Sequence, residues 1–422
     1  MTSLFSQFQI AAAYLRTRWL TARLKTRADV TAWQTRQLER FLAGPVATVP
    51  AYRELAGHPL EDFPIQDKAR LMADFERYNR LGMTSAEARE AWKKDQSPKG
   101  YAVGASTGTS GNRGFYVVSD AERYAWLGVI LGRGLPGFWR DRLKVAILLP
   151  ANSRLYDAAN ESRRLSLRFF DLHEGVERQA EAVEAWQPDV LVAPPKVLRL
   201  LSDRPSELAP RHVFSGAEVL DPLDRERIEA RFGVTVREIY MATEGLFAIA
   251  CPHGRLHLLE DHIAFEWEDD PAGGRLKSPL ITDFTRRTQV MVRYRMNDLL
   301  ELDTGPCPCG SPFTAVRAIA GRMDDVLSLP GPDGNVFITP DILRNTIIDA
   351  DPGIGDFRLV QTSPDRVIIT LPPENESAAL NAGQALQALF DRLGARVQLD
   401  SRIEPLPPPD SRKLRRVMRL KP

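Results

Sequence analysis

The chain has 422 residues, which exceeds the size at which one hydrophobic core usually stops growing, so two or more domains are expected. Its 43% hydrophobic and 26% charged residues are typical of a soluble globular protein. The 56 Lys and Arg residues nearly balance the 55 Asp and Glu residues, and the net charge of +1 predicts no nucleic-acid partner and no membrane partner.

The first apolar stretch, LFSQFQIAAAYLRTRWL, runs from Leu4 to Leu20. It lacks the preceding basic residues and the small-residue cleavage site of a signal peptide, and it is too short to span a bilayer. We therefore expect an amphipathic helix packed on the body of the protein. Three cysteines, an odd number in a chain without a signal, indicate a reducing compartment, and we expect the cytoplasm.

A loop rich in glycine and hydroxyl groups is predicted within ASTGTSGNRGFYVVSD, from Ala105 to Asp120. Its flanks are rich in Tyr, Val and Phe, which predicts strand–loop–strand. The residue types leave two interpretations open: a surface turn, or a cradle of hydroxyls and backbone amides for phosphate, with Arg113 supplying charge. No Gly-Lys-Ser/Thr follows, so the stretch is not a Walker A loop. The candidate cradle residues are Ser106, Thr107, Gly108, Thr109, Ser110 and Gly111.

From Lys144 onward, apolar runs alternate with helical patterns, which predicts a parallel α/β architecture. The predicted helix DPLDRERIEARFG has Asp221 as its N-cap, Pro222 in its first turn and Gly233 at its exit. A strand follows and ends in polar residues, where open α/β sheets bind ligands. Strands are predicted at 144–150, 189–195, 212–220 and 234–245, and a further helix at 175–187.

The sequence changes character after Gly321. The turn-rich segment 330–341 indicates a hinge region or a hairpin. A strand–strand–helix–strand order follows between 357 and 404, which is typical of a small α+β domain. We therefore expect domains at 1–321 and 322–422.

The only three cysteines, Cys251, Cys307 and Cys309, each lie beside a turn residue or a histidine. Three thiolates and one imidazole would complete a tetrahedral structural zinc site. Both His253 and His257 follow Cys251 closely enough to be the fourth ligand. The alternative is three unrelated thiols. The Cys-x-Cys spacing is shorter than the Cys-x₂-Cys spacing usual in zinc sites, and free cysteine is common in protein cores.

Eight segments resemble, in order, the adenylate-forming enzymes, in particular the branch with phenylacetate-CoA ligases and coenzyme F390 synthetases. They are STGTSGN, FSGAEVLD, YMATEG, GRLHLLEDHIAFEW, VRYRMNDLLEL, CPCG, IAGRMDDVL and SRKLRRV. The resemblance spans about three quarters of the chain, from Tyr101 to Met418. It implies an α/β protein whose large N-terminal adenylation domain has mixed and parallel sheets, followed by a small, mobile C-terminal α+β domain.

The resemblance also implies an activity. A carboxylic acid would react with ATP and Mg²⁺ to give an acyl adenylate and pyrophosphate, and coenzyme A would then take the acyl group as a thioester. The stretch that begins at Ser106 would hold the β- and γ-phosphates. Asn112, Arg113 and Gly114 stand where the family usually has Pro-Lys, and the planar fork of Arg113 differs from the point charge of a lysine.

YMATEG resembles the Tyr-Gly-x-Thr-Glu motif of the family. The resemblance places Glu244 on Mg²⁺, which prefers carboxylate oxygens, and Thr243 beside the α-phosphate. The alternative for the Thr-Glu dipeptide is the solvent-exposed start of a helix. Met241 stands where the family motif usually has glycine. The residues implied along the adenine and acyl pocket are Tyr240, Gly216, Ala217 and Glu218.

Asp298 of VRYRMND resembles the aspartate that binds both ribose hydroxyls, and a surface carboxylate at a strand end is the alternative. Arg322 would also reach the ribose, and Asp324 resembles the hinge of the small domain. Lys413 aligns with the C-terminal lysine that neutralises charge at the α-phosphate, although Arg412 replaces the usual glycine. The alternative for Lys413 is a basic tail that contacts an acidic partner.

The resemblance favours His257 over His253 as the zinc ligand, because family members carry Cys and Gly-x-His at this spacing. It does not fix the acid or the acyl acceptor, which could be coenzyme A, an amine or a carrier protein. Two rivals stay open: an amide-forming or AMP-transferring ligase, and a non-catalytic nucleotide-binding relative. Neither the acid nor the oligomeric state is predicted. Aromatic residues that could line an acid pocket, or equally belong to the core, are Tyr156, Phe169, Phe170 and Phe247.

Overall fold

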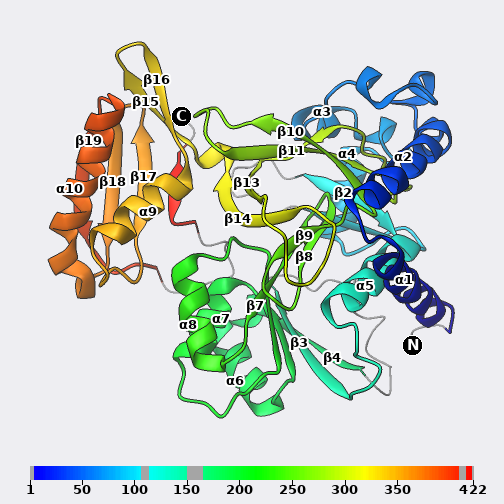
Figure 1. Cartoon of the computed structure of the whole chain (residues 1–422), viewed down its shortest axis with the longest axis horizontal. Helices are drawn as coiled ribbons and strands as arrows, with labels where there is room; N and C mark the ends of the chain where they lie inside the picture. The colour runs from blue at the N-terminus through cyan, green and yellow to red at the C-terminus, as the bar shows by residue number, and fades with distance from the viewer. Residues whose placement is uncertain (1–3, 106–113, 150–164, 408–414, 421–422) are drawn as a thin grey trace.

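The computed structural model describes residues 4–105, 114–149, 165–407 and 415–420. A twelve-stranded sheet runs through the larger body, and the C-terminal residues form a smaller lobe beside it, at the left of Figure 1. The mixed α/β fold class predicted from the sequence is confirmed. Among the described residues, no helix is long and apolar enough to cross a membrane.

One half of the large sheet is parallel, in the order β7-β6-β5-β3-β4. Alternate residues of β3 face opposite ways, so Val145 and Ile147 pack toward α5, whereas Ala146 and Leu148 pack under α6, α7 and α8. Burial on both faces explains the continuous apolar runs in the sequence. The strands are β3 (Leu143–Leu149), β4 (Leu165–Asp171), β5 (Val190–Ala193), β6 (His212–Gly216) and β7 (Val236–Ala242). The helices are α5 (Asp120–Gly134), α6 (Val176–Trp186), α7 (Pro195–Asp203) and α8 (Pro222–Phe232).

Helix α8 confirms the capping predicted from the sequence. The Asp221 carboxylate accepts the backbone N–H of Leu223 at 3.0 Å, and Pro222 occupies the first helical position. Gly233 ends the helix with a φ of 67°, a left-handed conformation that favours glycine.

The other half of the sheet is antiparallel and continues from β7 through β8. Its order is β8-β9-β14-β13-β11-β10, with β12 paired to β11. The bounds are β8 (Gly245–Ala250), β9 (Leu256–Leu258), β10 (Ile263–Asp269), β11 (Leu276–Asp283), β12 (Tyr294–Arg295), β13 (Asp298–Asp303) and β14 (Ala315–Arg322). The turn from β7 to β8 therefore lies where the sheet changes from parallel to antiparallel.

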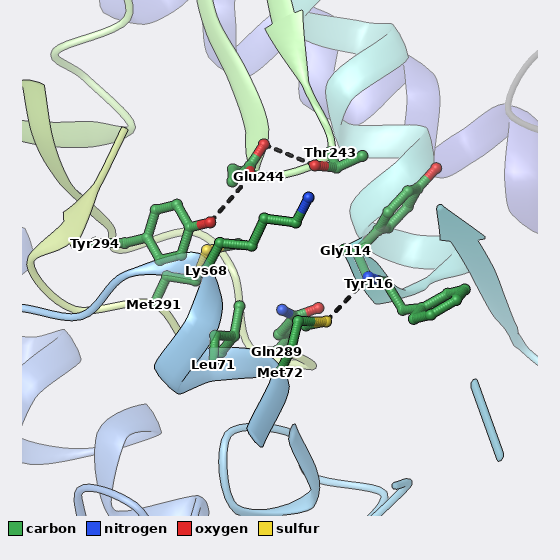
Figure 2. Close-up of a pocket in the computed structure, with 11 residues that line it drawn as sticks. Lys68, Leu71, Met72, Gly114, Tyr116, Thr243, Glu244, Gln289, Met291 and Tyr294 are labelled. Atoms are coloured by element: carbon green, nitrogen blue, oxygen red, sulfur yellow. Dashed lines mark hydrogen bonds between the residues drawn. The ribbon is translucent and has the colours of Figure 1, made fainter. Parts of the chain in front are cut away.

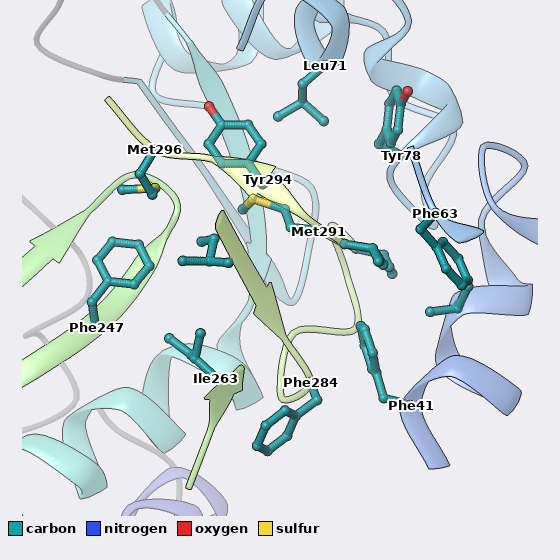
Figure 3. Close-up of a cluster of buried hydrophobic side chains, with 14 of the residues drawn as sticks. Phe41, Phe63, Leu71, Tyr78, Phe247, Ile263, Phe284, Met291, Tyr294 and Met296 are labelled. Atoms are coloured by element: carbon teal, nitrogen blue, oxygen red, sulfur yellow. The ribbon is translucent and has the colours of Figure 1, made fainter. Parts of the chain in front are cut away.

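The N-terminal segment packs against this antiparallel half. Phe41, Phe63 and Tyr78 enter the same apolar cluster as Phe247 and Met291 (Figure 3). Helices α1 (Leu4–Arg23), α2 (Arg27–Ala43), α3 (Lys68–Ala73) and α4 (Ser85–Lys93) precede the hairpin of β1 (Tyr101–Ala105) and β2 (Phe115–Ser119). This hairpin confirms the predicted strand–loop–strand. Helix α1 packs on α5, as the sequence predicts, but it also exposes large apolar side chains.

The C-terminal lobe has a separate apolar cluster of residues between Leu327 and Val417. Segment 330–341, which the sequence left open as hinge or hairpin, contains most of a β15–β16 hairpin. Its elements are β15 (Leu327–Gly331), β16 (Gly334–Ile338), α9 (Pro340–Ala350), β17 (Arg358–Ser363), β18 (Arg366–Leu371), α10 (Glu376–Leu393), β19 (Gln398–Ile403) and β20 (Val417–Arg419). The strand–strand–helix–strand order is confirmed, whereas the boundary at 321 and 322 stays a prediction.

Candidate active site

A small pocket opens where the β7–β8 turn faces the N-terminal segment. Figure 2 shows polar groups from separate regions of the chain converging on it. Thr243 and Glu244 come from the turn, Lys68 from α3 and Tyr294 from β12. Its lining is completed by Leu71, Met72, Gly114, Phe115, Tyr116, Gln289 and Met291.

The Glu244 carboxylate is held by two hydroxyl groups. Thr243 Oγ1 donates to Oε2 at 2.7 Å, and the Tyr294 hydroxyl donates to Oε1 at 3.1 Å. Burial, with the charge of Glu244 adding to it, raises the pKa of Tyr294, so this phenol keeps its proton and stays a donor. The carboxylate therefore has a fixed orientation and retains lone pairs for a further ligand.

Arg286 is fully buried and stabilises the β7–β8 turn by hydrogen bonds to backbone carbonyls. It donates to the backbone carbonyl of Glu244 at 2.7 Å and to that of Val117 on β2 at 3.1 Å. One guanidinium thus ties the β7–β8 turn to the β1–β2 hairpin.

Lys68 enters the pocket from the first turn of α3. Its ammonium group lies toward Thr243 and Glu244 in Figure 2. Backbone pairing fixes this approach, because the N–H of Gln66 donates to Arg293 O at 3.0 Å and the N–H of Arg295 donates to Gln66 O at 2.7 Å. The lysine stem crosses so close to Gly114 that a Cβ there would lie 2.8 Å from Lys68 Cε.

Asp298 lies beside this pocket at the start of β13. The Tyr240 hydroxyl donates to Asp298 Oδ2 at 2.6 Å, and Asp298 pairs in register with Arg322 on β14. Burial, followed by the charges of Asp298 and Glu244, raises the pKa of Tyr240 well above its usual value. The Glu244 and Asp298 carboxylates therefore act on the same phenol.

The segment after β6 carries the other predicted pocket residues. Gly216 ends the strand, and Ala217 has a φ of 67°, an uncommon conformation for a residue with a side chain. Glu218 forms a buried ion pair with Lys196 at 3.1 Å. The carboxylate of Asp324, the predicted hinge residue, accepts a hydrogen bond from the side-chain amide of Asn297 at 2.8 Å. Asn297 directly precedes Asp298 in the chain.

Several predicted site residues lie outside the described residues. They are Ser106, Thr107, Gly108, Thr109, Ser110, Gly111, Asn112, Arg113, Arg412, Lys413 and Tyr156. The structure does describe the residues that directly follow the segments 106–113 and 408–414. Gly114 lines the pocket, and Arg415 and Arg416 pair with Asp325 and Asp224.

The aromatic residues considered for an acid pocket are not gathered in one place. Phe170 is buried under α6, and Phe247 is buried in the core of the antiparallel half. Phe169 lies on β4 and packs against the opposite, α5-facing cluster. Phe170 and Phe247 thus belong to the core, the alternative that the sequence left open.

The cysteines form a second cluster. Sγ of Cys251, Cys307 and Cys309 and a ring nitrogen of His257 all lie within 4.8 Å of one another. His257 Nδ1 donates to Phe313 O at 3.1 Å, which leaves Nε2, 3.3 Å from Cys309 Sγ, as the acceptor nitrogen. Exposed His253 is not part of this group.

The donor set suits a zinc ion. Burial lowers the pKa of His257, which favours the neutral ring that a metal requires. Burial, together with the neighbouring thiols, raises the pKa of Cys309 to about 12. The Cys309 thiol therefore resists ionisation unless a cation joins it. Three sulfurs with one nitrogen match a tetrahedral structural site.

Sequence reasoning missed three residues of the pocket region: Lys68, Arg286 and Tyr294. Lys68 follows Asp67, which accepts the N–H of Arg70, so locally it resembles any residue behind a helix cap. Tyr294 lay within the segment that resembles the ribose motif, but its contact with Glu244 spans 50 residues. Neither carried a local pattern that indicates a site.

Comparison with known proteins gives matches over most of the chain. Phenylacetate-coenzyme A ligase of Pseudomonas putida is 27% identical over 347 residues, which cover 74% of this chain and 75% of that protein. The protein of the same name from Escherichia coli K12 is 26% identical over 352 residues, covering 76% of each. No protein-family model matches.

Solved structures share the fold. 2-Hydroxyisobutyryl-CoA ligase in the postadenylation state aligns with a TM-score of 0.66 at 17% identity, over 94% of this chain and 91% of that one. ATP-bound MatB from Rhodopseudomonas palustris aligns with a TM-score of 0.50 at 17% identity, over 72% and 64%. The predicted resemblance to adenylate-forming enzymes of the phenylacetate-CoA ligase branch is thereby confirmed.

Proposed function

We propose that the protein is an ATP-dependent carboxylate-activating ligase that forms an acyl adenylate and then a coenzyme A thioester. The similarity to phenylacetate-coenzyme A ligases over about three quarters of the chain supports this activity. The observation that carries it is the convergence of Glu244 and Lys68 on one pocket, with Gly114 at the edge of the predicted phosphate loop. Asp298 lies beside this pocket, where it accepts a hydrogen bond from Tyr240.

Glu244 is the candidate Mg²⁺ ligand. Its carboxylate is oriented by hydrogen bonds from Thr243 and Tyr294, as hydrogen bonds to the ligating side chain orient ligands in metal sites. Bound Mg²⁺ would neutralise charge on the phosphate oxygens. Thr243 would face the α-phosphate, and Lys68 would place a positive charge where negative charge develops.

Asp298 is the candidate ribose-binding residue. Tyr240 donates to Oδ2, which orients the carboxylate. A carboxylate held in this way would accept hydrogen bonds from ribose hydroxyls. Arg322, opposite Asp298 in the β13–β14 register, would approach the same sugar. Gly216, Ala217 and Glu218 would border the base and the acid.

Lys413 is the candidate catalytic lysine of the C-terminal lobe, with Asp324 as the hinge between domains 1–321 and 322–422. Among the described residues that follow Lys413, Arg415 pairs with Asp325 and Arg416 pairs with Asp224. Ser106 to Gly111 and Arg113 would hold the β- and γ-phosphates. Cys251, His257, Cys307 and Cys309 would hold a structural zinc ion.

The test is acid-dependent pyrophosphate release from ATP and Mg²⁺, across aromatic and aliphatic acids, each with and without coenzyme A. We expect release that depends on one class of acid and turnover that requires coenzyme A. Turnover without coenzyme A would instead identify an amine or a carrier protein as the acceptor.

Two variants make the assay specific. Glu244→Gln and Asp298→Asn preserve shape and remove one charge each, and Glu266→Gln is a control at a glutamate that pairs with Arg293 outside the pocket. We expect both site variants to lose about 10²-fold or more in kcat/KM, and the control to retain activity. No acid-dependent release by a folded protein that binds ATP would overturn the proposal.

A further inference from the structure

Helix α1 packs one apolar face on α5 and leaves a second apolar face largely exposed, where Trp19 packs edge-on against Trp33 at 6.4 Å. The inner face meets α5 closely, since a Cβ at Gly128 would lie 2.5 Å from Ala13 Cβ, and one at Gly132 would lie 2.8 Å from Thr17 Cγ2. The outer face carries Phe8, Leu15 and Trp19, which are 71%, 64% and 51% exposed. Their spacing of seven and four residues places them on one stripe of the helix.

The charged side chains of α1 itself are all basic. Arg16, Arg18 and Arg23 are exposed on α1, and no Asp or Glu occurs in residues 1–28. Arg23 lies over the Trp19 ring at 5.5 Å, and Arg16 lies over the ring of Trp33 at 6.0 Å. Within the described part of the chain, no carboxylate forms an ion pair with any of these three guanidinium groups.

A neighbouring loop extends the same surface. Tyr14 of α1 packs edge-on against Phe138 at 5.2 Å and donates its hydroxyl to Pro136 O at 2.7 Å. The next residue, Trp139, is 48% exposed, with Arg140 over its ring at 4.9 Å. We call this surface, made of the outer face of α1 and the loop at Trp139 and Arg140, the α1 surface.

We propose that the α1 surface docks on an anionic lipid membrane. Exposed aromatic and aliphatic side chains flanked by arginines, on a helix that lies at the edge of the molecule (Figure 1), are the features of helices that lie in the membrane interface. Tryptophan favours that interface, and basic side chains are attracted to anionic headgroups. The balanced net charge of the whole chain predicted no membrane partner, but that average conceals this one-sided distribution.

A second copy of the chain is the competing occupant, and charge disfavours it. Two α1 helices facing each other would bring Arg16, Arg18 and Arg23 of both copies together without an acidic residue of the same helix to pair with them. Anionic lipid supplies the missing negative charge. Docking through α1 also leaves the candidate active site free, because none of the α1 surface residues lines that pocket.

The experiment is co-sedimentation of the full-length protein with vesicles. One set contains phosphatidylcholine alone, and the other contains equimolar phosphatidylcholine and phosphatidylglycerol. We expect binding to the anionic vesicles that weakens with added salt, and little binding to the neutral ones. The triple variant Phe8→Gln, Leu15→Gln, Trp19→Gln and the double variant Arg16→Gln, Arg23→Gln should each bind about tenfold more weakly.

The matched control is Leu380→Gln with Leu393→Gln, which removes two exposed leucines from α10 of the C-terminal lobe. It should bind like the unmodified protein, and circular dichroism checks that all variants fold. Three outcomes would overturn the proposal: no sedimentation with anionic vesicles, binding unchanged by the α1 variants, or a dimer in light scattering that only the α1 variants abolish. Since no step uses ATP or an acid, failure here would leave the proposed enzyme activity intact.

Discussion

Arg416 and Asp224 form a buried, two-pronged ion pair between the C-terminal lobe and helix α8. Arg416 Nη1 and Nη2 donate to the two carboxylate oxygens at 2.9 and 3.1 Å. Arg416 Nε also donates to Asp356 at 2.9 Å, and Arg199 of α7 bridges Asp224 and Asp356 at 3.3 and 3.2 Å. The pair thus lies at the centre of a charged network that joins the two parts of the chain.

Arg416→Ala should separate the C-terminal lobe from the body. Removing one partner leaves Asp224 buried without its main counter-charge, which typically costs about 3–5 kcal/mol. We expect a larger radius of gyration in small-angle X-ray scattering and a lower denaturant midpoint. The double variant Arg416→Met, Asp224→Leu is the control, since an apolar replacement of a whole pair is often neutral. Identical scattering curves for Arg416→Ala and the unmodified protein would contradict this prediction.

Acid should also weaken the contact between the C-terminal lobe and the body, because protonation of Asp356 removes a charge that pairs with Arg416 and Arg199. Burial alone would raise its pKa, but Arg416, Arg358 and Arg199 outweigh burial and hold the pKa below its ordinary value of 3.8. Because the folded pKa is the lower one, the contribution of Asp356 is complete above the ordinary pKa and is lost as the pH falls below it. Scattering at decreasing pH should show the lobes separating below about pH 4.

Asp356→Asn tests the assignment of that acid transition. The variant should show weaker docking already at neutral pH and a smaller change on acidification, because the titrating group is gone. A transition of the same size in Asp356→Asn would assign the pH dependence to other carboxylates.

The sequence predicted those parts of the site that depend on local patterns. Helix α8 follows from its Asp-Pro start and its glycine exit, and Glu244 and Asp298 follow from motifs at strand ends. Both carboxylates raise the pKa of Tyr240, and their roles at the site stay predictions. The pattern also limited the fourth member of the cysteine cluster to two histidines, of which His257 alone is buried there.

Residues brought to the site by distant pairing could not be predicted in this way. Lys68 reaches the pocket because Gln66 forms a bridge with Tyr294, a partner more than 200 residues away. Arg286 is a charged residue at a fully buried position, which composition and periodicity argue against. Its place is determined by backbone carbonyls on two other elements, and no local sequence records them.

Lys68→Met should lower activity without unfolding the protein. The substitution keeps the apolar stem and removes the charge near Thr243 and Glu244, so we expect kcat/KM for pyrophosphate release to fall by about 10²-fold. Gly114→Ala should have a smaller effect of the same kind, because its Cβ would displace the end of the Lys68 side chain. Lys99→Met, at an exposed lysine, is the control, and a loss equal to that of Lys68→Met would contradict the assignment.

The cysteine cluster should hold about one zinc ion per chain, measured by elemental analysis after dialysis. Cys309→Ser and His257→Ala should lower both the zinc content and the melting temperature. His253→Ala is the matched control, because this histidine is exposed and lies outside the cluster. Zinc content unchanged in Cys309→Ser would exclude the site.

Tyr294→Phe should weaken the response to Mg²⁺ while preserving the fold. The variant removes the hydroxyl that donates to Glu244 Oε1 at 3.1 Å and leaves the ring in the core (Figure 3). Loss of a hydrogen-bond donor that orients a metal ligand typically costs about 10- to 100-fold in metal affinity or activity. A Mg²⁺ titration of pyrophosphate release should therefore shift to higher concentration.

Tyr78→Phe is a closely matched control for that titration. Its hydroxyl donates to Gln66 Oε1, also at 3.1 Å, and lies among buried side chains outside the lining of the pocket. Both variants lose one buried tyrosine hydrogen bond, so both should lose similar stability, about 1 kcal/mol. Only Tyr294→Phe should alter the Mg²⁺ dependence, because only its hydroxyl orients Glu244. Equal shifts in both variants would mean that the effect comes from general loosening of the core and that Glu244 does not bind the metal through this arrangement.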